Sequence, residues 1–473
     1  MMSKLFSTTA IPAIAGRIKN SGLRRYAQEE DGSVTIFAGA VIVMILLVAG
    51  IAYDLQRHEM ERVRIQSTAD MAVLAAADLD QTLDPQAVVQ DYFDKAGIPN
   101  GTNAITVEEG LNFRTVSVNA DGTIPTNFMT MLGIDTLPLR SRAEAEERVN
   151  NVEISMVLDI SGSMASGDKM PNLRDAAETF VDTVINDSTR DLVSISIIPY
   201  SEHVSAGPAI MSKFNVDWNN PYSHCMEFSD SDFNTSTMRR NKQYDQVQHM
   251  EWGSNTMSLN TPVCPVGQHE DIVAFSQDAA ALKYKISRLV PRGSTSIFAG
   301  MKWAAGLLDP DFNSINVSLA QDGITDPVFT ARPAAFSDRE TLKTVILMTD
   351  GQNHYSYRIN NNYYANASHA AHWNNYSLDW YLNRYVNSWQ RSSWKYLKYW
   401  PEYGDSLLSN VCSAAKEKNI VIWSIGFEVT DYSAGVMRDC ASSPSHFFRV
   451  EGVEIKEAFK AIARQINQLR LTQ

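Results

Sequence analysis

The sequence is short of basic residues. Its 41 lysines and arginines are outnumbered by 54 aspartates and glutamates, which gives a net charge of −13. After residue 30 the chain has no dense run of Lys or Arg. Because a surface that follows a phosphate backbone needs a basic excess, this composition argues against nucleic acid as a partner.

Cysteine is also scarce, with four residues in 473: Cys225, Cys264, Cys412 and Cys440. Four cysteines allow three pairings, and free buried thiols are the alternative. In an oxidising compartment disulfides are the better expectation. We favour the pairs Cys225–Cys264 and Cys412–Cys440.

Long apolar runs are rare as well, and one stands out at residues 34–53, VTIFAGAVIVMILLVAGIAY, which carry no charge. A helix of this length spans roughly 30 Å, the thickness of a bilayer core. A cleaved signal peptide usually has a shorter apolar region and a small-residue cleavage site. We therefore predict an uncleaved membrane-spanning helix. The N-terminus should be cytoplasmic, because residues 1–25 contain five basic residues and no acidic one: Lys4, Arg17, Lys19, Arg24 and Arg25.

The helical pattern continues beyond the apolar run. Residues 54–80 contain no Gly or Pro, and Ile65, Ala69, Ala72 and Ala76 recur at helical spacing. We expect a basic tail at 1–31, a transmembrane helix and stalk at 32–80, and a small α+β module at 81–149. That module should hold a helix at 85–96 and strands at 104–107, 113–120 and 138–147, with a turn at ADG, residues 120–122.

From residue 150 to 473 apolar strand patterns alternate with amphipathic helix patterns. This alternation predicts an α/β domain with a mainly parallel sheet covered by helices. Two long insertions, 205–268 and 352–403, interrupt the pattern. The second contains ten of the 18 tyrosines and five of the nine tryptophans. Such a composition fits either a recognition surface or a self-packed subdomain.

Three segments place oxygen-bearing side chains at the ends of predicted elements. Asp159, Ser161 and Ser163 form a D-x-S-x-S motif after one strand, Thr295 lies where a loop enters a helix, and Asp350 ends the strand 341–350. Hard divalent cations prefer oxygen ligands, and ligands bind at the carboxyl ends of parallel strands. A helix cap is the simpler explanation of the motif alone. The nearby GSMASGDK is not a phosphate-binding loop, because Asp168 stands where lysine should follow the second glycine.

Taken together, the three segments resemble the metal-ion-dependent adhesion site (MIDAS) of von Willebrand factor type A domains, over roughly residues 150–470. The resemblance implies a Rossmann-like fold and one coordination position left open for a partner's carboxylate. It also implies Mg²⁺, or Mn²⁺ or Ca²⁺, bound by the five residues of the three segments: Asp159, Ser161, Ser163, Thr295 and Asp350.

The N-terminal region resembles a second family. The apolar anchor, the YD at its end and QSTAD before an alanine run are similar to the opening of TadE/TadG-like Flp (tight adherence) pilus-assembly proteins. CASSPSHFFRV and the closing helix resemble the TadG type. Phe37 stands five residues after Gly32, where a prepilin-peptidase substrate has glutamate. This difference argues against cleavage by a prepilin peptidase.

These resemblances imply a bacterial inner-membrane protein with its bulk in the periplasm. We expect it to be a non-enzymatic component of pilus assembly that binds a partner protein through an acidic side chain. The alternative is a metal-dependent hydrolase or adhesin acting on envelope or surface material. A hydrolase would need a base beside the ion and a closed pocket. The pair His369 and His372 lacks the other features of a zinc site, so we favour surface histidines.

Overall fold

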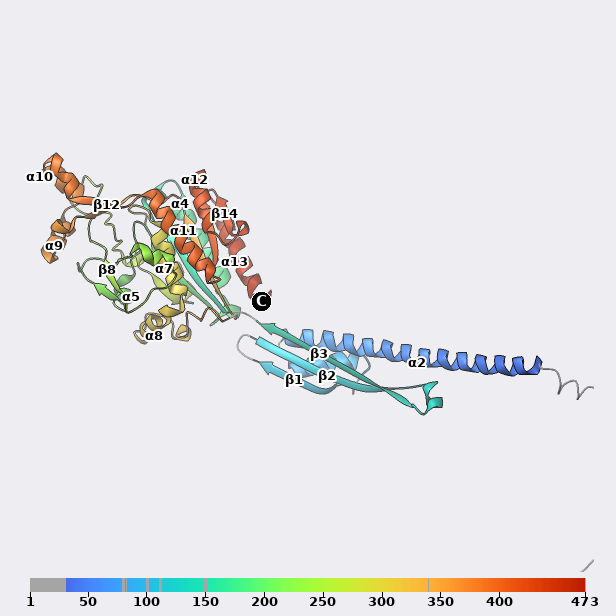
Figure 1. Cartoon of the computed structure of the whole chain (residues 1–473). Helices are drawn as coiled ribbons and strands as arrows, with labels where there is room; N and C mark the ends of the chain where they lie inside the picture. The colour runs from blue at the N-terminus through green and yellow to red at the C-terminus, as the bar shows by residue number, and fades with distance from the viewer. Residues whose placement is uncertain are drawn as a thin grey trace, which may run out of the picture. The chain divides into compact units, whose positions relative to one another are not determined.

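The computed structural model describes residues 31–78, 81, 83–98, 102–109, 113–148, 151–338 and 340–472. The predicted basic tail lies outside these residues except for Asp31. The chain divides into two compact units, residues 1–147 and 148–473, each with its own hydrophobic core (Figure 1).

The first unit begins with one long helix, α2, which is Asp31–Ala77 and contains 47 residues. The prediction that the helix continues past the apolar run is therefore confirmed. By its length and composition, the segment Val34–Ala77 is long and apolar enough to cross a membrane. The side chains of that segment that face outward include Ile42, Met44 and Leu46.

The C-terminal half of α2 belongs to the core of the small module. Ala69, Ala72 and Ala76 are fully buried against α3 (Pro85–Lys95) and a three-stranded sheet. The predicted helix α3 is confirmed, and the Asp84 carboxylate caps it by accepting from the Ala87 amide at 3.1 Å. The sheet has the order β1-β2-β3, with these bounds: β1 Thr102–Glu109, β2 Phe113–Pro125 and β3 Thr136–Arg148.

The predicted turn at residues 120–122 is wrong. Strand β2 runs through Asp121 and Gly122, and Leu139 of β3 lies across from Gly122. A glycine inside a strand gives room without ending it. The chain turns instead at residues 126–135, which contain the short 3-10 helix η1, Met129–Leu132.

The second unit is built on a six-stranded sheet of order β14-β13-β10-β4-β5-β9. All neighbours are parallel except β5 and β9. Strand β4 lies between β10 and β5, so their carboxyl ends meet at the middle of one edge. The strands have these bounds: β4 Asn151–Asp159, β5 Val193–Tyr200, β9 Val273–Ser276, β10 Thr341–Thr349, β13 Val421–Phe427 and β14 Phe447–Val450.

Helices cover both faces of this sheet because its strands are apolar on both sides. Along β4, Val157 packs into one core while its neighbours Met156 and Leu158 pack into the other. On the first face lie α7 Ile297–Leu308, α8 Asn313–Gln321, α11 Pro401–Glu417 and α12 Asp431–Cys440. On the second lie α4 Lys169–Val184, α6 Ala279–Ser287 and α13 Glu454–Thr472. The predicted α/β class is confirmed.

The two long insertions pack on each other. Val247 and Met250 of the first share a core with Ile359, Trp373 and Leu382 of the second. The aromatic-rich segment is therefore a packed subdomain, which still exposes other rings at its surface. The first insertion contains α5 Gly207–Met211, β6 Asn215–Asp217, β7 Met226–Glu227 and β8 Gln243–Gln246. The second contains β11 Ser356–Ile359, α9 Ala367–Asn375, α10 Leu378–Tyr385 and β12 Lys395–Tyr399.

Both favoured disulfides are present. Cys225–Cys264 lies in the core that the insertions share, and Cys412–Cys440 joins α11 to α12. All four cysteines are thus paired, and the chain carries no thiol for labelling or metal binding.

Candidate metal centre

Three loops converge at the carboxyl edge of the sheet. The loop after β4 is tied to the loop before α7, because the Gly162 amide donates to the Gly293 carbonyl at 3.0 Å. The Thr295 carbonyl in turn accepts from the His354 amide, 2.9 Å away, in the loop after β10. A side chain at Gly162 would meet the Gly293 carbonyl oxygen at 3.0 Å. The glycine therefore allows the first two loops to approach each other closely.

Three of the predicted ligands form a chain of oxygen atoms. Ser161 Oγ lies 3.0 Å from Ser163 Oγ, and Ser163 Oγ donates to Asp350 Oδ1 at 2.6 Å. Adjacent ligands of an octahedral ion with 2.0–2.1 Å bonds lie about 2.9 Å apart. The spacing of these three oxygens is close to that value, so they fit a small hard cation.

Thr295 lies beside this chain. Its side chain is 7% exposed and lines the same pocket as Ser163 and Gly351. Among the described residues its hydroxyl has no hydrogen-bond partner. Because Thr295 lines the pocket, its hydroxyl is suited to a ligand or an ion that enters there.

Asp159 is the most enclosed of the five. It is fully buried, and its carboxylate accepts from the Ser161 amide and the Thr349 hydroxyl, each at 2.7 Å, and from the Tyr200 hydroxyl at 3.2 Å. Burial, with the nearby charge of Asp350, raises the pKa of Asp159 to about 6. Asp159 therefore holds the loop after β4 in place, and a cation bound there would keep its carboxylate ionised.

A lysine missed by sequence reasoning reaches into the centre. Lys169 Nζ, from the first turn of α4, donates to Asp350 Oδ2 at 2.9 Å and lies 3.7 Å from the Glu428 carboxylate. Lys169 is the last residue of GSMASGDK, the segment considered as a phosphate-binding loop. The spacing of that segment does not show that α4 begins at this lysine and directs its side chain toward Asp350. The centre thus contains two aspartates, three hydroxyls and one internal cation.

The five predicted ligands do not include the histidine or cysteine side chains that most transition-metal sites use. Within the part of the chain that the structure describes, no group of three His, Cys, Asp or Glu residues could hold a metal ion. The donor set is entirely oxygen, which suits Mg²⁺, Mn²⁺ or Ca²⁺. His369 and His372 lie partly exposed on α9, and His369 Nδ1 accepts from the Ala365 amide.

A pocket of about 660 Å³ opens beside the oxygen chain. Both insertions contribute to its wall, with Glu251 and Trp252 from the first and Gln352 and His354 from the second. Neither contribution could be placed from the sequence, because each depends on how a long connection folds back over the sheet.

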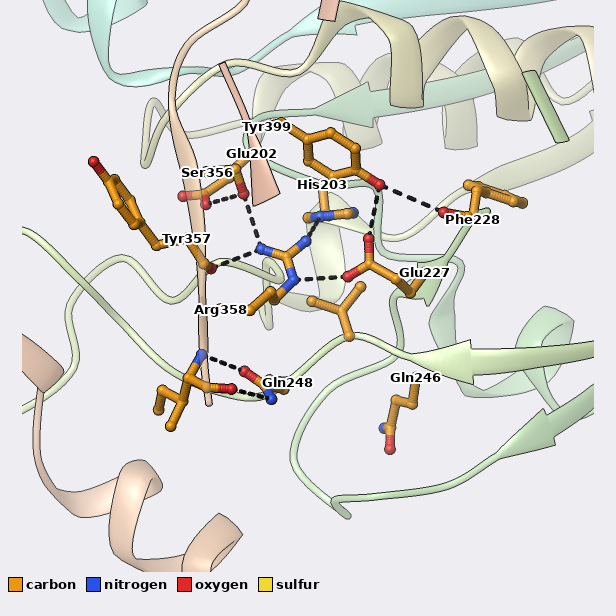
Figure 2. Close-up of polar contacts among 12 residues, drawn as sticks. Glu202, His203, Glu227, Phe228, Gln246, Gln248, Ser356, Tyr357, Arg358 and Tyr399 are labelled. Carbon is orange, nitrogen blue, oxygen red and sulfur yellow. Dashed lines mark hydrogen bonds and ion pairs between the residues drawn. The ribbon is translucent and has the colours of Figure 1, made fainter. Parts of the chain in front are cut away.

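A buried polar network joins the sheet to both insertions (Figure 2), and its member Glu202 also lines the pocket. Arg358 of β11 lies at its centre. The guanidinium donates to Glu227 at 2.7 Å, to Ser356 Oγ at 2.9 Å and to His203 Nε2. Glu202, which follows β5, accepts from Ser356 Oγ at 2.6 Å and from the Trp252 indole at 2.8 Å.

The network sets unusual protonation states. Burial raises the pKa of Glu202 to about 7. Burial and the charge of Arg358 lower the pKa of His203 to about 3. Burial alone would raise the pKa of Glu227, but the charge and hydrogen bond of Arg358, together with the charges of His203 and Lys398, outweigh burial and lower the pKa to about 2. Arg358 and Glu227 therefore form an ion pair, and neutral His203 presents a lone pair to the guanidinium.

Comparison with known proteins identifies the N-terminal segment first. Residues 32–79 match a family model described as putative Flp pilus-assembly TadE/G-like. This segment is therefore TadE/G-like, as its motifs predict. No curated protein sequence matches the chain at a significant level.

Several solved structures are similar to this chain. The chain is similar to the vWF domain of the type V pili tip protein Mfa5 from Porphyromonas gingivalis, with 16% identity and a TM-score of 0.36, covering 69% of this chain and 97% of that one. It is also similar to the pilus adhesin SpaC from Lactobacillus rhamnosus GG, with 13% identity and a TM-score of 0.35, covering 77% of this chain and 34% of that one.

A third similar structure is proximal thread matrix protein 1 from the mussel byssus, described with a zinc-occupied MIDAS motif. It has 13% identity and a TM-score of 0.29, and the match covers 68% of this chain and 46% of that one. The second unit is an α/β domain with a mostly parallel sheet, and in the chain it follows an N-terminal apolar helix.

Proposed function

We propose that this chain is a membrane-anchored, periplasmic component of Flp pilus assembly, of the TadG type, that binds a partner protein through a divalent cation. The observation that carries the proposal is the combination on one chain of a TadE/G-like segment and a strand-end group of oxygen ligands. The basic N-terminal flank supports an orientation with the bulk of the chain in the periplasm. Both disulfides agree with that compartment.

The ion would be held by the hydroxyls of Ser161, Ser163 and Thr295 and the carboxylate of Asp350. Asp159 would orient the loop that carries the two serines. Mg²⁺, Mn²⁺ or Ca²⁺ suits these donors. When bound, the ion supplies a positive centre that can take a carboxylate oxygen from a partner in the position that the protein leaves open.

The partner would also contact the rim of the pocket. Tyr355 follows the pocket-lining His354 and is 43% exposed. Farther along the same insertion, Trp389 is 76% exposed. Tyr and Trp give large contact areas at low entropic cost. The ion and this aromatic surface would form one docking face, because both follow the carboxyl end of β10.

A binding role is favoured over a hydrolase because the acidic side chains of the pocket are engaged in structure. Glu251 accepts from the Thr261 amide at 2.9 Å and also from the Asn260 amide, and so shapes its own loop. Glu202 accepts two hydrogen bonds within the network. A general base needs an accessible acceptor near the reacting water, and these two carboxylates are committed elsewhere.

The experiment uses Thr295→Val, which removes the unpartnered hydroxyl and keeps the side-chain shape. Thr325→Val is the matched control, because Thr325 is a buried threonine like Thr295, its hydroxyl is unpartnered among the described residues, and it is not one of the proposed ligands. Melting temperature is measured with and without Mg²⁺ or Mn²⁺. We expect the ion-dependent rise to be lost in Thr295→Val and kept in Thr325→Val. An equal rise in both variants would overturn the metal centre.

Partner binding is tested by crosslinking in membranes followed by purification of the chain, with and without chelator. A crosslinked band that disappears with chelator and in Thr295→Val is expected. Crosslinked bands that change neither with chelator nor in Thr295→Val would contradict ion-dependent docking.

The orientation of the chain is tested with a reporter that is active only in the periplasm, fused after Glu147. The reporter should be active, and a silent reporter would contradict the orientation.

A further inference from the structure

The turn between β2 and β3 is an uncharged, apolar tip. Residues 126–134 read TNFMTMLGI and contain no charged side chain. Met131 is 74% exposed and Leu132 is 57% exposed, and Phe128 and Ile134 are also open to the surroundings. An exposed group of large apolar side chains on a small module marks an interaction surface.

This tip is fixed to α2 by one carboxylate. Asp54 is buried, and it accepts from the backbone amides of Asn127 at 3.0 Å, Phe128 at 2.7 Å and Met129 at 2.9 Å. Three hydrogen bonds to a carboxylate are strong and directional. The aspartate that ends the apolar run is therefore covered by the tip instead of facing lipid or water.

A glycine on the helix provides the matching space. A Cβ at Gly50 would lie 2.5–2.8 Å from atoms of the Phe128 side chain, and Tyr53 meets the Phe128 ring edge-on at 6.1 Å. Any larger residue at position 50 would push the tip away. The tip is thereby held at the level of residues 50–54 of α2, the last turn of the predicted span.

The tip lies at the level where the predicted span, residues 34–53, ends. Gly50 lies three residues before Tyr53, which is roughly 4.5 Å along a helix axis. The tip also satisfies its own backbone. Thr126 N donates to Asp135 O, Gly133 N to Thr130 O, and Ile134 N to Met129 O, at 3.0, 3.0 and 3.1 Å. Backbone that enters lipid must be satisfied internally.

We propose that residues Phe128–Ile134 insert into the outer interfacial layer of the bilayer as a second membrane contact, beside the spanning helix. This inference rests on the proposed membrane anchor. Two contacts on one rigid module fix the rotation of α2 about its axis and the tilt of the module above the membrane. A single helix leaves both free.

A groove of about 850 Å³ between the tip and α2, lined by Val43, Leu46, Leu47 and Met131 among others, could also seat a helix of another subunit. Lipid is favoured for a specific reason. The groove continues directly into the exposed side of the apolar helix, where Val43 and Leu46 are 58% and 63% exposed, and none of its lining residues is charged. A bilayer that covers the exposed side of the apolar helix must therefore also cover the groove.

The test uses the full chain in phosphatidylcholine/phosphatidylglycerol vesicles with a polarity-sensitive fluorophore on single introduced cysteines. The native cysteines are all in disulfides, so labelling is selective. The sites are Met131→Cys at the tip, Ile45→Cys within the span, and Asn119→Cys on an exposed position of β2. Lipids with a nitroxide near the headgroup or deep in the chain quench the probe according to its depth.

We expect the Met131 probe to be quenched more by the shallow nitroxide, the Ile45 probe more by the deep one, and the Asn119 probe by neither. If Ile45 is quenched and Met131 behaves like Asn119, the membrane anchor stands and the tip proposal is overturned. If Ile45 is also unquenched, the anchor itself fails. A Met131 probe in an apolar environment that no lipid nitroxide quenches would show a protein occupant, which also overturns the proposal.

A second variant separates insertion from mere exposure. Asp54→Ala, in the Met131→Cys background, removes the acceptor of the three backbone amides. We expect the shallow quenching at Met131 to be lost while the quenching of an Ile45 probe in the same Asp54→Ala background persists. Unchanged quenching at Met131 would show that Asp54 does not position the tip and would overturn that step.

Discussion

Lys169 Nζ lies 2.9 Å from Asp350 Oδ2, on the opposite carboxylate oxygen from the one that accepts from Ser163. The chain therefore places its own cation at a carboxylate that the metal centre would use. Glu428, 3.7 Å from Lys169, is an alternative partner for the ammonium group. A divalent cation bound at the proposed centre would compete with Lys169 for the negative charge of Asp350.

The competition predicts that Lys169→Met binds divalent cations more tightly. Two unit charges of the same sign about 4 Å apart repel by roughly 4 kcal/mol at an effective dielectric constant of 20, and a divalent ion doubles this to roughly 8 kcal/mol. A share of that repulsion disappears with the ammonium. We expect the Kd for Mn²⁺ to fall by at least about tenfold, which is ~1.4 kcal/mol, as measured by titration calorimetry. Lys456→Met, which removes the partner of Asp175 on the surface, should leave the Kd unchanged. Weaker binding in Lys169→Met would mean that the lysine supports the site.

The convergence of Asp159, Ser161, Ser163 and Asp350 was predictable because parallel strands end at a common edge and both strands are strongly apolar. The hydroxyls of Thr349 and Tyr200 carry no comparable signal, since their hydrogen bonds to Asp159 join residues far apart in sequence. The contact of Lys169 with Asp350 could not be predicted either, because these two residues are also far apart in sequence.

The shortest strands could not be predicted from hydrophobic periodicity. Strands β9 and β14 have four residues each, too few to show a repeat. The pocket wall formed by Glu251 and Trp252 depends on the fold of a long polar insertion, which packs partly against the second insertion and partly into the core of the α/β domain. Sequence patterns describe faces of single elements, and they do not show which distant loops will share a core.

Packing of α7 on the sheet is expected to depend on Gly300. A Cβ there would lie 2.7 Å from Val157 of β4 and 3.0 Å from the Tyr200 ring. Gly300→Ala should therefore push the helix outward and lower the free energy of unfolding by about 1–3 kcal/mol. Gly435→Ala in α12 is the control, because a Cβ there meets nothing within 4 Å. It should stabilise the chain by about 0.5–1 kcal/mol. Urea unfolding of both variants distinguishes steric packing from helix propensity.

The Cys225–Cys264 disulfide should stabilise the insertions rather than the sheet. Its loop spans 39 residues, and closing a loop of that size is worth about 4 kcal/mol in the chain-entropy model. In Cys225→Ser/Cys264→Ser we expect hydrogen exchange to quicken around Val247 and Trp373 while β4 and β10 keep their protection. Cys412→Ser/Cys440→Ser, whose disulfide lies in the core under the sheet, is the comparison. Uniform loss of protection in the first variant would contradict a separate subdomain core.

The buried network predicts a specific dependence of stability on pH. His203 has a pKa lowered to about 3 in the folded chain from an ordinary 6.5. The unfolded chain therefore binds one more proton between these values, and stability is lost as pH falls from 6.5 toward 3. Glu202, raised to about 7 from 4.5, acts in the opposite direction. Its contribution is complete below pH 4.5 and is lost as pH rises through 7, so the two nearly cancel between 4.5 and 6.5.

The histidine is isolated by comparison with His203→Gln, in which the amide oxygen still accepts from Arg358 but cannot titrate. We expect the stability difference between the wild-type chain and this variant to shrink by about 1.4 kcal/mol for each pH unit below 6.5, because one proton is involved. Unfolding free energies from urea titrations at pH 7.5, 6, 5 and 4 give the slope. A difference that is the same at all four pH values would show that His203 is not held neutral against Arg358.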